Sequence, residues 1–300
     1  MNKLIFHCRV KSRRHNAYVN PAESFSRYIS DFFQFNFESK FYRFKRNEPA
    51  NYILSDGFIY KTRRDCVLEN LENGKCLIIR YGDKDNSGVM ESNFLDNRFK
   101  FCFDYQFNSN YKHKIKTFPF TYFKFTSTQE EQKFTNFECK KNIIIGRFKL
   151  KTNKIRKFLF NNRFSLNENV FLTNEKINSG DYINELNDYR YGISLPGFGD
   201  FCHRDIEIIS RKCLLVRPVF KNTFFNHIEP YEHYLPIRVD SVDNFNDDVE
   251  KILKTKEHEY NRIVDNAYNW YLNNCIVGNF EKNILTKELK EYVYENFIRN

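Results

Sequence analysis

Residues 191–207 have the sequence YGISLPGFGDFCHRDIE, in which a short apolar run is followed by a turn and then by polar helix-start residues. Pro196, Gly197 and Gly199 supply the turn, because proline presets one backbone angle and glycine accepts angles that other residues avoid. A continuous apolar run is typical of a strand buried on both faces of a parallel sheet. The stretch therefore predicts a strand–loop–helix unit of an α/β fold.

The same alternation extends on both sides of this unit. Further strands are predicted at residues 142–146, 169–173, 213–217 and 233–237, and helices at 151–161, 182–187 and 204–211, with a short helical turn near Phe224. Apolar residues at three-and-four spacing predict one long amphipathic helix over 247–273 and another from Ile284 to Phe297. Strands and helices that alternate at this pitch indicate right-handed βαβ units in a doubly wound sheet.

The N-terminal half gives weaker signals. Strands are predicted at residues 76–80 and 99–107, and the polar stretch 126–138 is the expected joint between domains. With 300 residues the chain is long enough for two domains of average size. We therefore expect one domain over residues 1–130, a second over 131–275, and a last helix within 276–300 that packs back across the joint.

Composition narrows the possible partners. The chain has 48 Lys and Arg against 38 Asp and Glu, a formal charge of +10, which favours nucleic acid, a phosphorylated ligand or an anionic membrane surface without choosing among them. The 8 cysteines form no C-x-x-C pair, so neither a zinc site nor a disulfide scaffold is indicated. No segment approaches 18 apolar residues. These features predict a soluble, cytoplasmic protein without a transmembrane segment.

The loop after the strand at 142–146 is one candidate binding site, since ligands of open parallel sheets lie beyond the carboxyl ends of the strands. Residues 140–157 contain eight basic residues and no acidic one. Two interpretations remain open. The segment is a solvated basic surface, or Gly146 brings the backbone close to a ligand whose phosphate Arg147 binds in bidentate fashion.

The loop at 194–203 is the second candidate. Here a diphosphate would be held by backbone N–H groups, the start of the helix and the Arg204 guanidinium, while a carboxylate accepted hydrogen bonds from ribose hydroxyls. The alternative is a tight turn followed by a helix that Asp200 or Asp205 merely caps.

Residues 191–275 resemble the C-terminal half of GT-B glycosyltransferases of family 90, which includes protein O-glucosyltransferases and capsular xylosyltransferase-like enzymes, with exostosin-like proteins as looser relatives. YGISLPG is similar to the strand and turn before the donor helix of that family, and Arg204 falls near its diphosphate-binding arginine. Residues 230–237, PYEHYLPI, resemble the family's Pro-Trp-x-His-Tyr-x-Pro-Val. The family's Arg-Gly donor-loop element is reversed here as Gly146-Arg147, and its Ser-Phe-Arg is Cys-His-Arg.

The resemblance implies an α/β protein of GT-B type, with two Rossmann-like domains facing a central cleft. It also implies inverting transfer of a sugar from a nucleotide-diphosphate donor, such as a UDP-sugar, to a hydroxyl of a glycan, protein or lipid, with no metal or other cofactor required. Asp83 is the expected general base, with Asp85 and Asp56 as alternatives. The predicted donor-binding residues are Arg147, Lys151, Gly197, Gly199, Asp200, His203, Arg204, Asp205 and Glu207.

Two other functions compete with this one. Asp83-Lys-Asp85 has the Asp-x-Asp form with which other glycosyltransferases hold a divalent metal and a diphosphate. The positive charge, together with many aromatic residues, also suggests a nucleic-acid-binding protein. However, no helix-turn-helix, zinc finger or aromatic RNA-binding motif is visible in the sequence, so nucleic acid is the less favoured partner.

Overall fold

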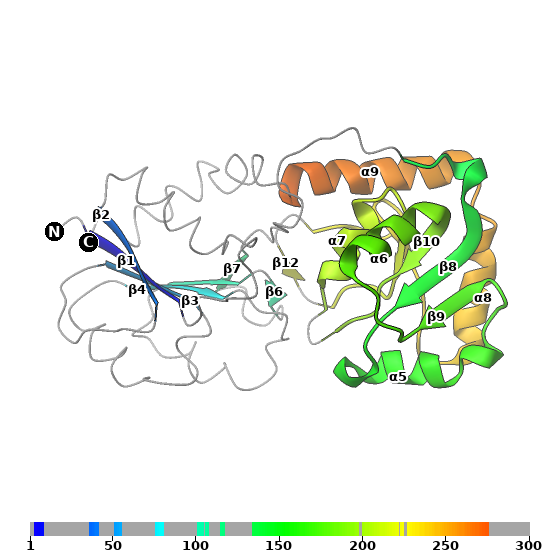
Figure 1. Cartoon of the computed structure of the whole chain (residues 1–300), viewed down its shortest axis with the longest axis horizontal. Coiled ribbons are helices and arrows are strands. Elements are labelled where there is room, and N and C mark those ends of the chain that lie inside the picture. The colour runs from blue at the N-terminus through cyan, green and yellow to red at the C-terminus, as the bar shows by residue number, and fades with distance from the viewer. Residues whose placement is uncertain are drawn as a thin grey trace.

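The structure of the chain is a computed structural model. It describes the strands between residues 3 and 117 and residues 134–197, 200–221, 223–224 and 227–275 (Figure 1). Asp56, Asp83, Asp85, Gly199 and the helix expected within 276–300 lie outside the described residues. The domain boundary near residue 130 stays a prediction.

The first sheet has six strands, all parallel, in the order β2-β1-β3-β4-β5-β7. The bounds are β1 (Lys3–Cys8), β2 (Asn36–Phe41), β3 (Asn51–Ser55), β4 (Cys76–Arg80), β5 (Phe101–Asp104) and β7 (Ile115–Thr117). The strand predicted at 76–80 is confirmed as β4.

The strand predicted over 99–107 is divided between two sheets. Its first part is β5, and its second part, β6 (Gln106–Phe107), pairs antiparallel with β12 (Thr223–Phe224) in a separate two-stranded sheet. The helical turn predicted near Phe224 is therefore wrong. Thr223 and Phe224 are a β-branched and an aromatic residue that suit a strand once a partner is present, and that partner lies more than 100 residues earlier in the chain.

The second sheet has five parallel strands in the order β13-β11-β10-β8-β9. The bounds are β8 (Lys141–Arg147), β9 (Val170–Thr173), β10 (Tyr189–Ile193), β11 (Leu214–Arg217) and β13 (Leu235–Pro236). All five predicted strands are present, although β13 is shorter than expected. In both sheets the first strand lies between the second and the third, so the winding direction reverses at β1/β3 and at β8/β10. In such sheets the reversal point is where ligands bind.

Five α-helices accompany the second sheet: α5 (Lys154–Asn161), α6 (Ser179–Glu185), α7 (His203–Ile209), α8 (Val242–Leu253) and α9 (Glu257–Cys275). Short 3-10 helices lie at Phe137–Cys139, Leu150–Thr152, Arg163–Ser165 and Leu186–Asp188. The helices predicted at 151–161, 182–187 and 204–211 correspond to α5, α6 and α7.

The single helix predicted over 247–273 is wrong, because the structure has two helices there. The first begins earlier, where the Ser241 hydroxyl accepts a hydrogen bond from the backbone N–H of Asn244. It ends at Leu253, where both the backbone N–H and the hydroxyl of Thr255 donate to the Ile252 carbonyl. The threonine thus occupies a carbonyl that a continuous helix would use, and α9 starts afresh at Glu257. Amphipathic spacing on both sides of the break hides it from the sequence.

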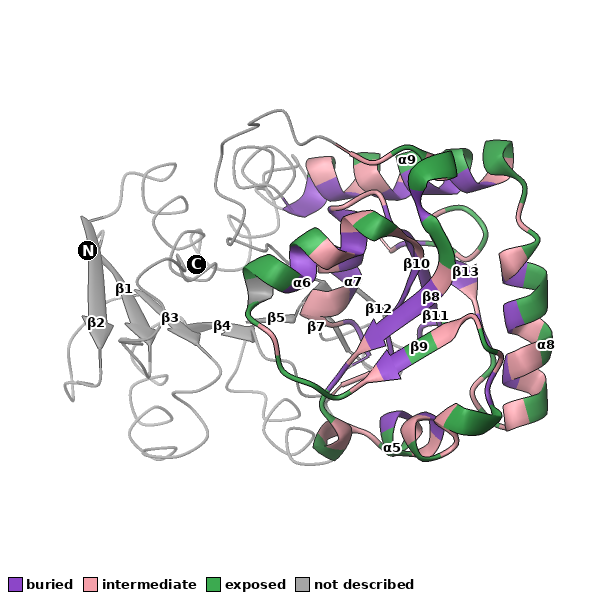
Figure 2. Cartoon of the chain, turned by 45° about the vertical axis from the view of Figure 1, so that its right-hand side comes forward, coloured by how far each residue is buried: buried purple, intermediate pink, exposed green. Residues whose placement is uncertain are grey.

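The helices cover both faces of the second sheet (Figure 2). Neighbouring residues of β8 point to opposite faces: Ile144 packs in a cluster with residues of α5 and α8, and Ile145 in a cluster with residues of α6, α7 and α9. Burial on both faces explains why these strands are continuously apolar. Within the described residues, no helix is both long and apolar enough to cross a membrane.

Candidate functional site

The two candidate loops lie side by side at the carboxyl edge of the second sheet. They follow β8 and β10, which are paired strands at the reversal point of the sheet. The start of α5 holds the second loop in place: Asn153 Nδ2 donates to the Gly197 carbonyl at 3.3 Å, and Arg156 Nε donates to the Leu195 carbonyl at 3.2 Å. The fold thus brings together two segments that are separated by about 50 residues, as expected for a ligand site of this architecture.

Gly146, at the end of β8, is required by packing. A Cβ at this position would lie 2.5 Å from Ile193 Cγ2 and 2.9 Å from Leu172 Cδ2, both of them side-chain atoms of neighbouring strands. These distances are shorter than any ordinary contact. The close approach that the sequence suggested therefore exists, but it is an approach of β8 to the side chains of β9 and β10.

We expect Gly146→Ala to destabilise the protein by about 1–3 kcal/mol, the usual cost of overpacking a core. Adding Ile193→Ala should recover part of that loss, because it removes the Cγ2 atom that the new methyl group meets. Urea denaturation of the two single variants and the double variant measures this coupling. Gly180→Ala is the control, since a Cβ there has its nearest neighbour at 3.3 Å. If the two losses simply add, packing at Gly146 is not the reason for the glycine.

Arg147 is held by α6. Its Nε and Nη2 donate to the two carboxylate oxygens of Glu185 at 2.6 and 2.8 Å, and its Nη1 lies 3.8 Å from Glu175. The bidentate face that a phosphate would use is thus engaged by a carboxylate, which leaves Nη1. That nitrogen is buried and has no hydrogen-bond partner among the described residues.

The second loop is anchored by Arg217, a residue that our sequence reasoning missed. This arginine ends β11 and is completely buried, with its Nη1 2.8 Å from Asp205 Oδ1 and its Nη2 3.0 Å from Asp200 Oδ1. Asp200 Oδ2 accepts from the backbone N–H of Lys221, and Asp205 Oδ2 accepts from that of Cys202 at 2.7 Å. All four carboxylate oxygens therefore accept hydrogen bonds from protein donors.

This arrangement matches the alternative interpretation of Asp200 and Asp205, a tight turn followed by a capped helix. Asp205 is the third residue of α7, and its bond to the Cys202 N–H closes the first turn. A role for these carboxylates in ribose binding stays a prediction. The sequence does contain a signal for Arg217. It is a charged residue directly after the apolar residues 214–216, and two aspartates, Asp200 and Asp205, precede it by 17 positions or fewer.

Arg204 and Tyr182 face each other between α7 and α6. The guanidinium carbon of Arg204 lies 5.8 Å from the centre of the Tyr182 ring. Arg204 Nε and Tyr182 Oη are both buried, and neither makes a hydrogen bond of good geometry to the residues that the structure describes, although the two side chains interact with each other. Burial raises the pKa of Tyr182, so the phenol keeps its proton and remains a donor. Tyr182 also interacts electrostatically with Arg147.

Three buried polar atoms on β8, α6 and α7 thus lie at one edge of the sheet without a hydrogen-bond partner in the described part of the chain: Arg147 Nη1, Tyr182 Oη and Arg204 Nε. Leaving a buried donor unsatisfied costs about 1–3 kcal/mol. Other buried polar atoms of the described residues, such as Tyr191 Oη and Tyr234 Oη, share this state, so what distinguishes the three donors is that they lie at the same edge of the sheet. All three groups are donors. The positive charge of Arg147 is already paired with Glu185, so Arg204 supplies the cation and the other two groups supply hydrogen bonds. The cluster is therefore suited to an anionic hydrogen-bond acceptor.

The remaining predicted residues take different positions. Lys151 is exposed in the 3-10 helix before α5. Gly197 lies beside the Arg156 guanidinium, and a Cβ added to this glycine would lie 3.2 Å from Arg156 Nη2. His203 and Glu207 are half-buried on α7. Gly199 and Asp83 are outside the described residues. Sequence reasoning missed Arg156 and Tyr182 as well as Arg217.

The described residues give little support to a metal site or to catalysis by a cysteine nucleophile. No three His, Cys, Asp or Glu side chains come together there as a metal site. Asp83 and Asp85 lie outside this set, so the metal-free and the Asp-x-Asp interpretations both stay predictions. Burial raises the pKa of the Cys202 thiol to about 11, so it remains protonated at neutral pH and is not a ready nucleophile.

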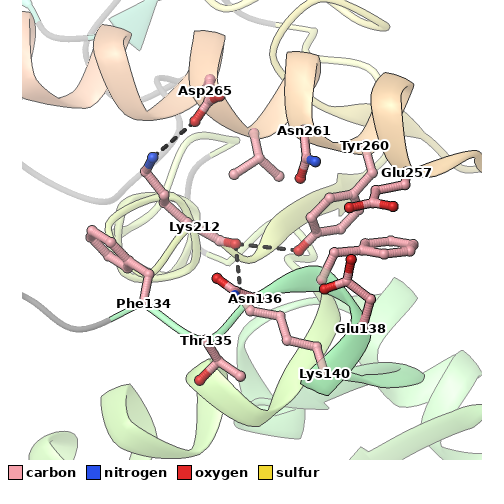
Figure 3. Close-up of a pocket in the computed structure, with 12 residues that line it drawn as sticks. Phe134, Thr135, Asn136, Glu138, Lys140, Lys212, Glu257, Tyr260, Asn261 and Asp265 are labelled. Carbon is pink, nitrogen blue, oxygen red and sulfur yellow. Dashed lines mark hydrogen bonds and ion pairs between the residues drawn. The ribbon is translucent and has the colours of Figure 1, made fainter.

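A cavity of about 400 Å³ lies at the opposite edge, near the amino ends of β8 and β11 (Figure 3). Its walls come from the segment before β8, from Lys212 and from α9. The buried Lys140 donates from Nζ to the Lys212 carbonyl at 2.8 Å, and the Tyr260 hydroxyl donates to the same carbonyl at 3.3 Å. These bonds connect the starts of β8 and β11 to α9. The cavity is therefore distant from the edge where the unsatisfied donors gather.

Comparisons with known proteins identify the fold. No protein-family model matches the sequence, and no curated protein matches it. Among solved structures, a glycosyltransferase from Rickettsia africae ESF-5 matches with 12% identity and a TM-score of 0.57, over 99% of this chain and 100% of that chain. An alpha1,3-fucosyltransferase matches with 10% identity and a TM-score of 0.54, over 99% and 90%. The matches do not single out family 90. They confirm the predicted fold class: the chain has the α/β architecture of GT-B proteins.

Proposed function

We propose that the chain is a glycosyltransferase that moves a sugar from a nucleotide-diphosphate donor to a hydroxyl acceptor. The observation that carries the proposal is the donor cluster of Arg147, Tyr182 and Arg204 at the reversal point of the second sheet. The GT-B fold and the motif resemblance to family 90 support the same function. We further propose the inverting, metal-independent reaction of that family.

The diphosphate is the group that this cluster suits. When the bond from the sugar to the diphosphate breaks, negative charge grows on the departing phosphate oxygen. The Arg204 guanidinium and Arg147 Nη1 stabilise that charge, and the Tyr182 hydroxyl donates a further hydrogen bond. Glu185 orients Arg147 through its other two nitrogens. Preorganised donors are effective because they need no rearrangement during the reaction.

Arg217 positions this site without touching the ligand. By pairing with Asp200 before α7 and with Asp205 inside it, the buried guanidinium fixes where the helix starts. Arg204 lies directly before Asp205, so its direction depends on that anchor. Arg156 and Asn153 fix the other end of the same loop. Arg217, Arg156 and Asn153 are thus positioning residues.

The acceptor and the general base belong to the N-terminal half in this proposal. Asp83 takes the proton of the acceptor hydroxyl while the acceptor oxygen bonds to the anomeric carbon and the diphosphate leaves with the electron pair. In the competing proposal, Asp83 and Asp85 coordinate a divalent metal ion that binds the diphosphate. Loss of turnover with a chelator and recovery with Mn²⁺ would favour that version and contradict the metal-free one.

The test of the function is a thermal-shift screen of the full chain against nucleoside diphosphates and their sugar conjugates. A ligand that binds only the folded state raises the melting temperature with its concentration. We expect one nucleoside diphosphate and its sugar conjugate to raise it, and the nucleoside alone to do so much less. A flat response across a panel of uridine, guanosine, adenosine, cytidine and thymidine compounds would contradict the proposal. Tighter, salt-sensitive binding to unrelated oligonucleotides would favour nucleic-acid binding instead.

A further inference from the structure

A basic segment of the sequence without acidic residues includes α5. Residues 139–167 contain no Asp or Glu. Five lysines of this segment are exposed, and within the described part of the chain none of them has an ion-pair partner: Lys141, Lys149, Lys151, Lys154 and Lys157. The last four lie just before α5 or on it. Elsewhere some exposed basic residues have partners, such as Arg238 with Asp248 and Arg262 with Glu232, whereas the exposed Lys176 and Lys256 have none among the described residues. What distinguishes the segment around α5 is the concentration of its positive charge.

A protruding aromatic residue accompanies this charge. Phe164 follows α5 in a 3-10 helix and is 86% exposed, more than any other large apolar side chain of the described residues. The Arg163 guanidinium lies 4.2 Å from the centre of the Phe164 ring and 4.4 Å from that of Phe160. We call Lys149, Lys151, Lys154, Lys157, Arg163 and Phe164 the basic aromatic face. Figure 2 shows the exposed residues of α5 along the outer side of the domain.

We propose that the basic aromatic face docks the protein reversibly on an anionic membrane surface. Lysines within a Debye length of acidic headgroups are attracted to them, and an exposed aromatic ring gains by entering the boundary between headgroups and acyl chains. Arg163 can pair with a headgroup phosphate while Phe164 lies below it. The contact proposed here is peripheral, because it uses exposed side chains on the surface of the protein.

The same features fit nucleic acid less well. Binding to single strands relies on aromatic faces that stack with bases. The Arg163 guanidinium already lies 4.2 Å from the centre of the Phe164 ring, and Phe160 is only partly exposed. Phe164 is thus a single protruding ring, which suits insertion better than a series of stacked bases.

The experiment is co-sedimentation of the full chain with phosphatidylcholine vesicles, with and without phosphatidylglycerol at about 30% of the lipid. We expect binding to the anionic vesicles alone, and weaker binding as salt is raised. Lys154→Glu with Lys157→Glu should weaken vesicle binding at least about tenfold, because each lysine near the surface contributes to attraction and each glutamate is repelled. Phe164→Ser should weaken it several-fold at unchanged charge.

The matched control is Lys251→Glu with Lys254→Glu on α8. Both lysines are exposed, and the pair changes the net charge by the same amount. An equal loss in this control would show that only net charge matters and would overturn the proposal, as would an unchanged Phe164→Ser variant or equal binding to neutral vesicles. Tighter binding of a 20-residue single-stranded DNA through the same lysines would favour nucleic acid. No nucleotide sugar enters this assay, so its outcome is independent of the proposed function.

Discussion

Replacing Arg217 with alanine is expected to lower the free energy of unfolding by about 3–5 kcal/mol, the cost of removing one partner from a buried ion pair. The guanidinium is completely buried and serves two aspartates, one before α7 and one within it. Without it, both carboxylates lose their charged partner in a nearly dry environment, and the start of α7 loses its anchor. The loss is large because a buried charge without a partner is far more costly than an absent pair.

Urea denaturation followed by tryptophan fluorescence measures this loss. Trp270 is the single tryptophan of the chain, and its ring lies 6.2 Å from that of Phe201, the neighbour of Asp200. Arg262→Ala is the control, since its exposed pair with Glu232 should contribute below ~1 kcal/mol. If Arg217→Ala does not fold, Arg217→Lys is expected to fold with an intermediate loss. Arg217→Ala as stable as the control variant would show that the cluster contributes nothing.

Replacing Arg204 with alanine is expected to weaken binding of the nucleoside diphosphate selected by the screen by more than about 1.5 kcal/mol, which is over tenfold. The protein should remain folded with nearly unchanged stability. The two buried carboxylates of this region, Asp200 and Asp205, pair with Arg217, so the removal of Arg204 leaves both with their charged partner. Both Arg217 and Arg204 are arginines near the start of α7, but the expected effects of their removal differ. Removal of Arg217 lowers the stability of the fold, and removal of Arg204 lowers the affinity for the ligand.

Calorimetric titration of the folded variants tests this separation. Arg204→Lys keeps the charge but loses the planar fork, so we expect it to bind with an affinity between those of the wild type and Arg204→Ala. Arg262→Ala should bind as the wild type does. Unchanged affinity of Arg204→Ala would remove this residue from the site, and a large loss of stability would show that Arg204 is structural instead.

Local order along the chain was predictable because it depends on near neighbours. The strand–loop–helix unit at residues 191–207 followed from one apolar run, one proline and two glycines. The five strands of the second sheet were likewise visible as apolar runs. The same local reasoning predicted a single helix over 247–273. It failed there because the hydrogen bond from the Thr255 hydroxyl to the Ile252 carbonyl, which ends the first helix, is not visible in the apolar spacing. It also placed a helical turn at Phe224, whose strand partner is Gln106.

The candidate site was only partly predictable. Its two loops and its edge of the sheet were expected from the sequence, as were Arg147 and Arg204. The partners of these residues were not. The bidentate bond between Arg147 and Glu185 joins residues 38 positions apart, and Arg217 reaches Asp200 across 17. No spacing rule connects such pairs, because they meet only after β8, β10 and β11 have assembled.

The sequence by itself determined the type and order of most strands of the second sheet and of its covering helices, since hydrophobic period and turn residues act over a few positions. Only the tertiary structure decided which strands are neighbours, and therefore that the winding reverses at β8/β10. The tertiary structure also decided which charged groups pair with an opposite charge, as Asp200 and Asp205 do with Arg217, and which keep a donor without a partner in the described part of the chain, as Arg204 does. That distinction depends on desolvation and on partners brought from distant parts of the chain, neither of which exists before the sheet and its helices pack.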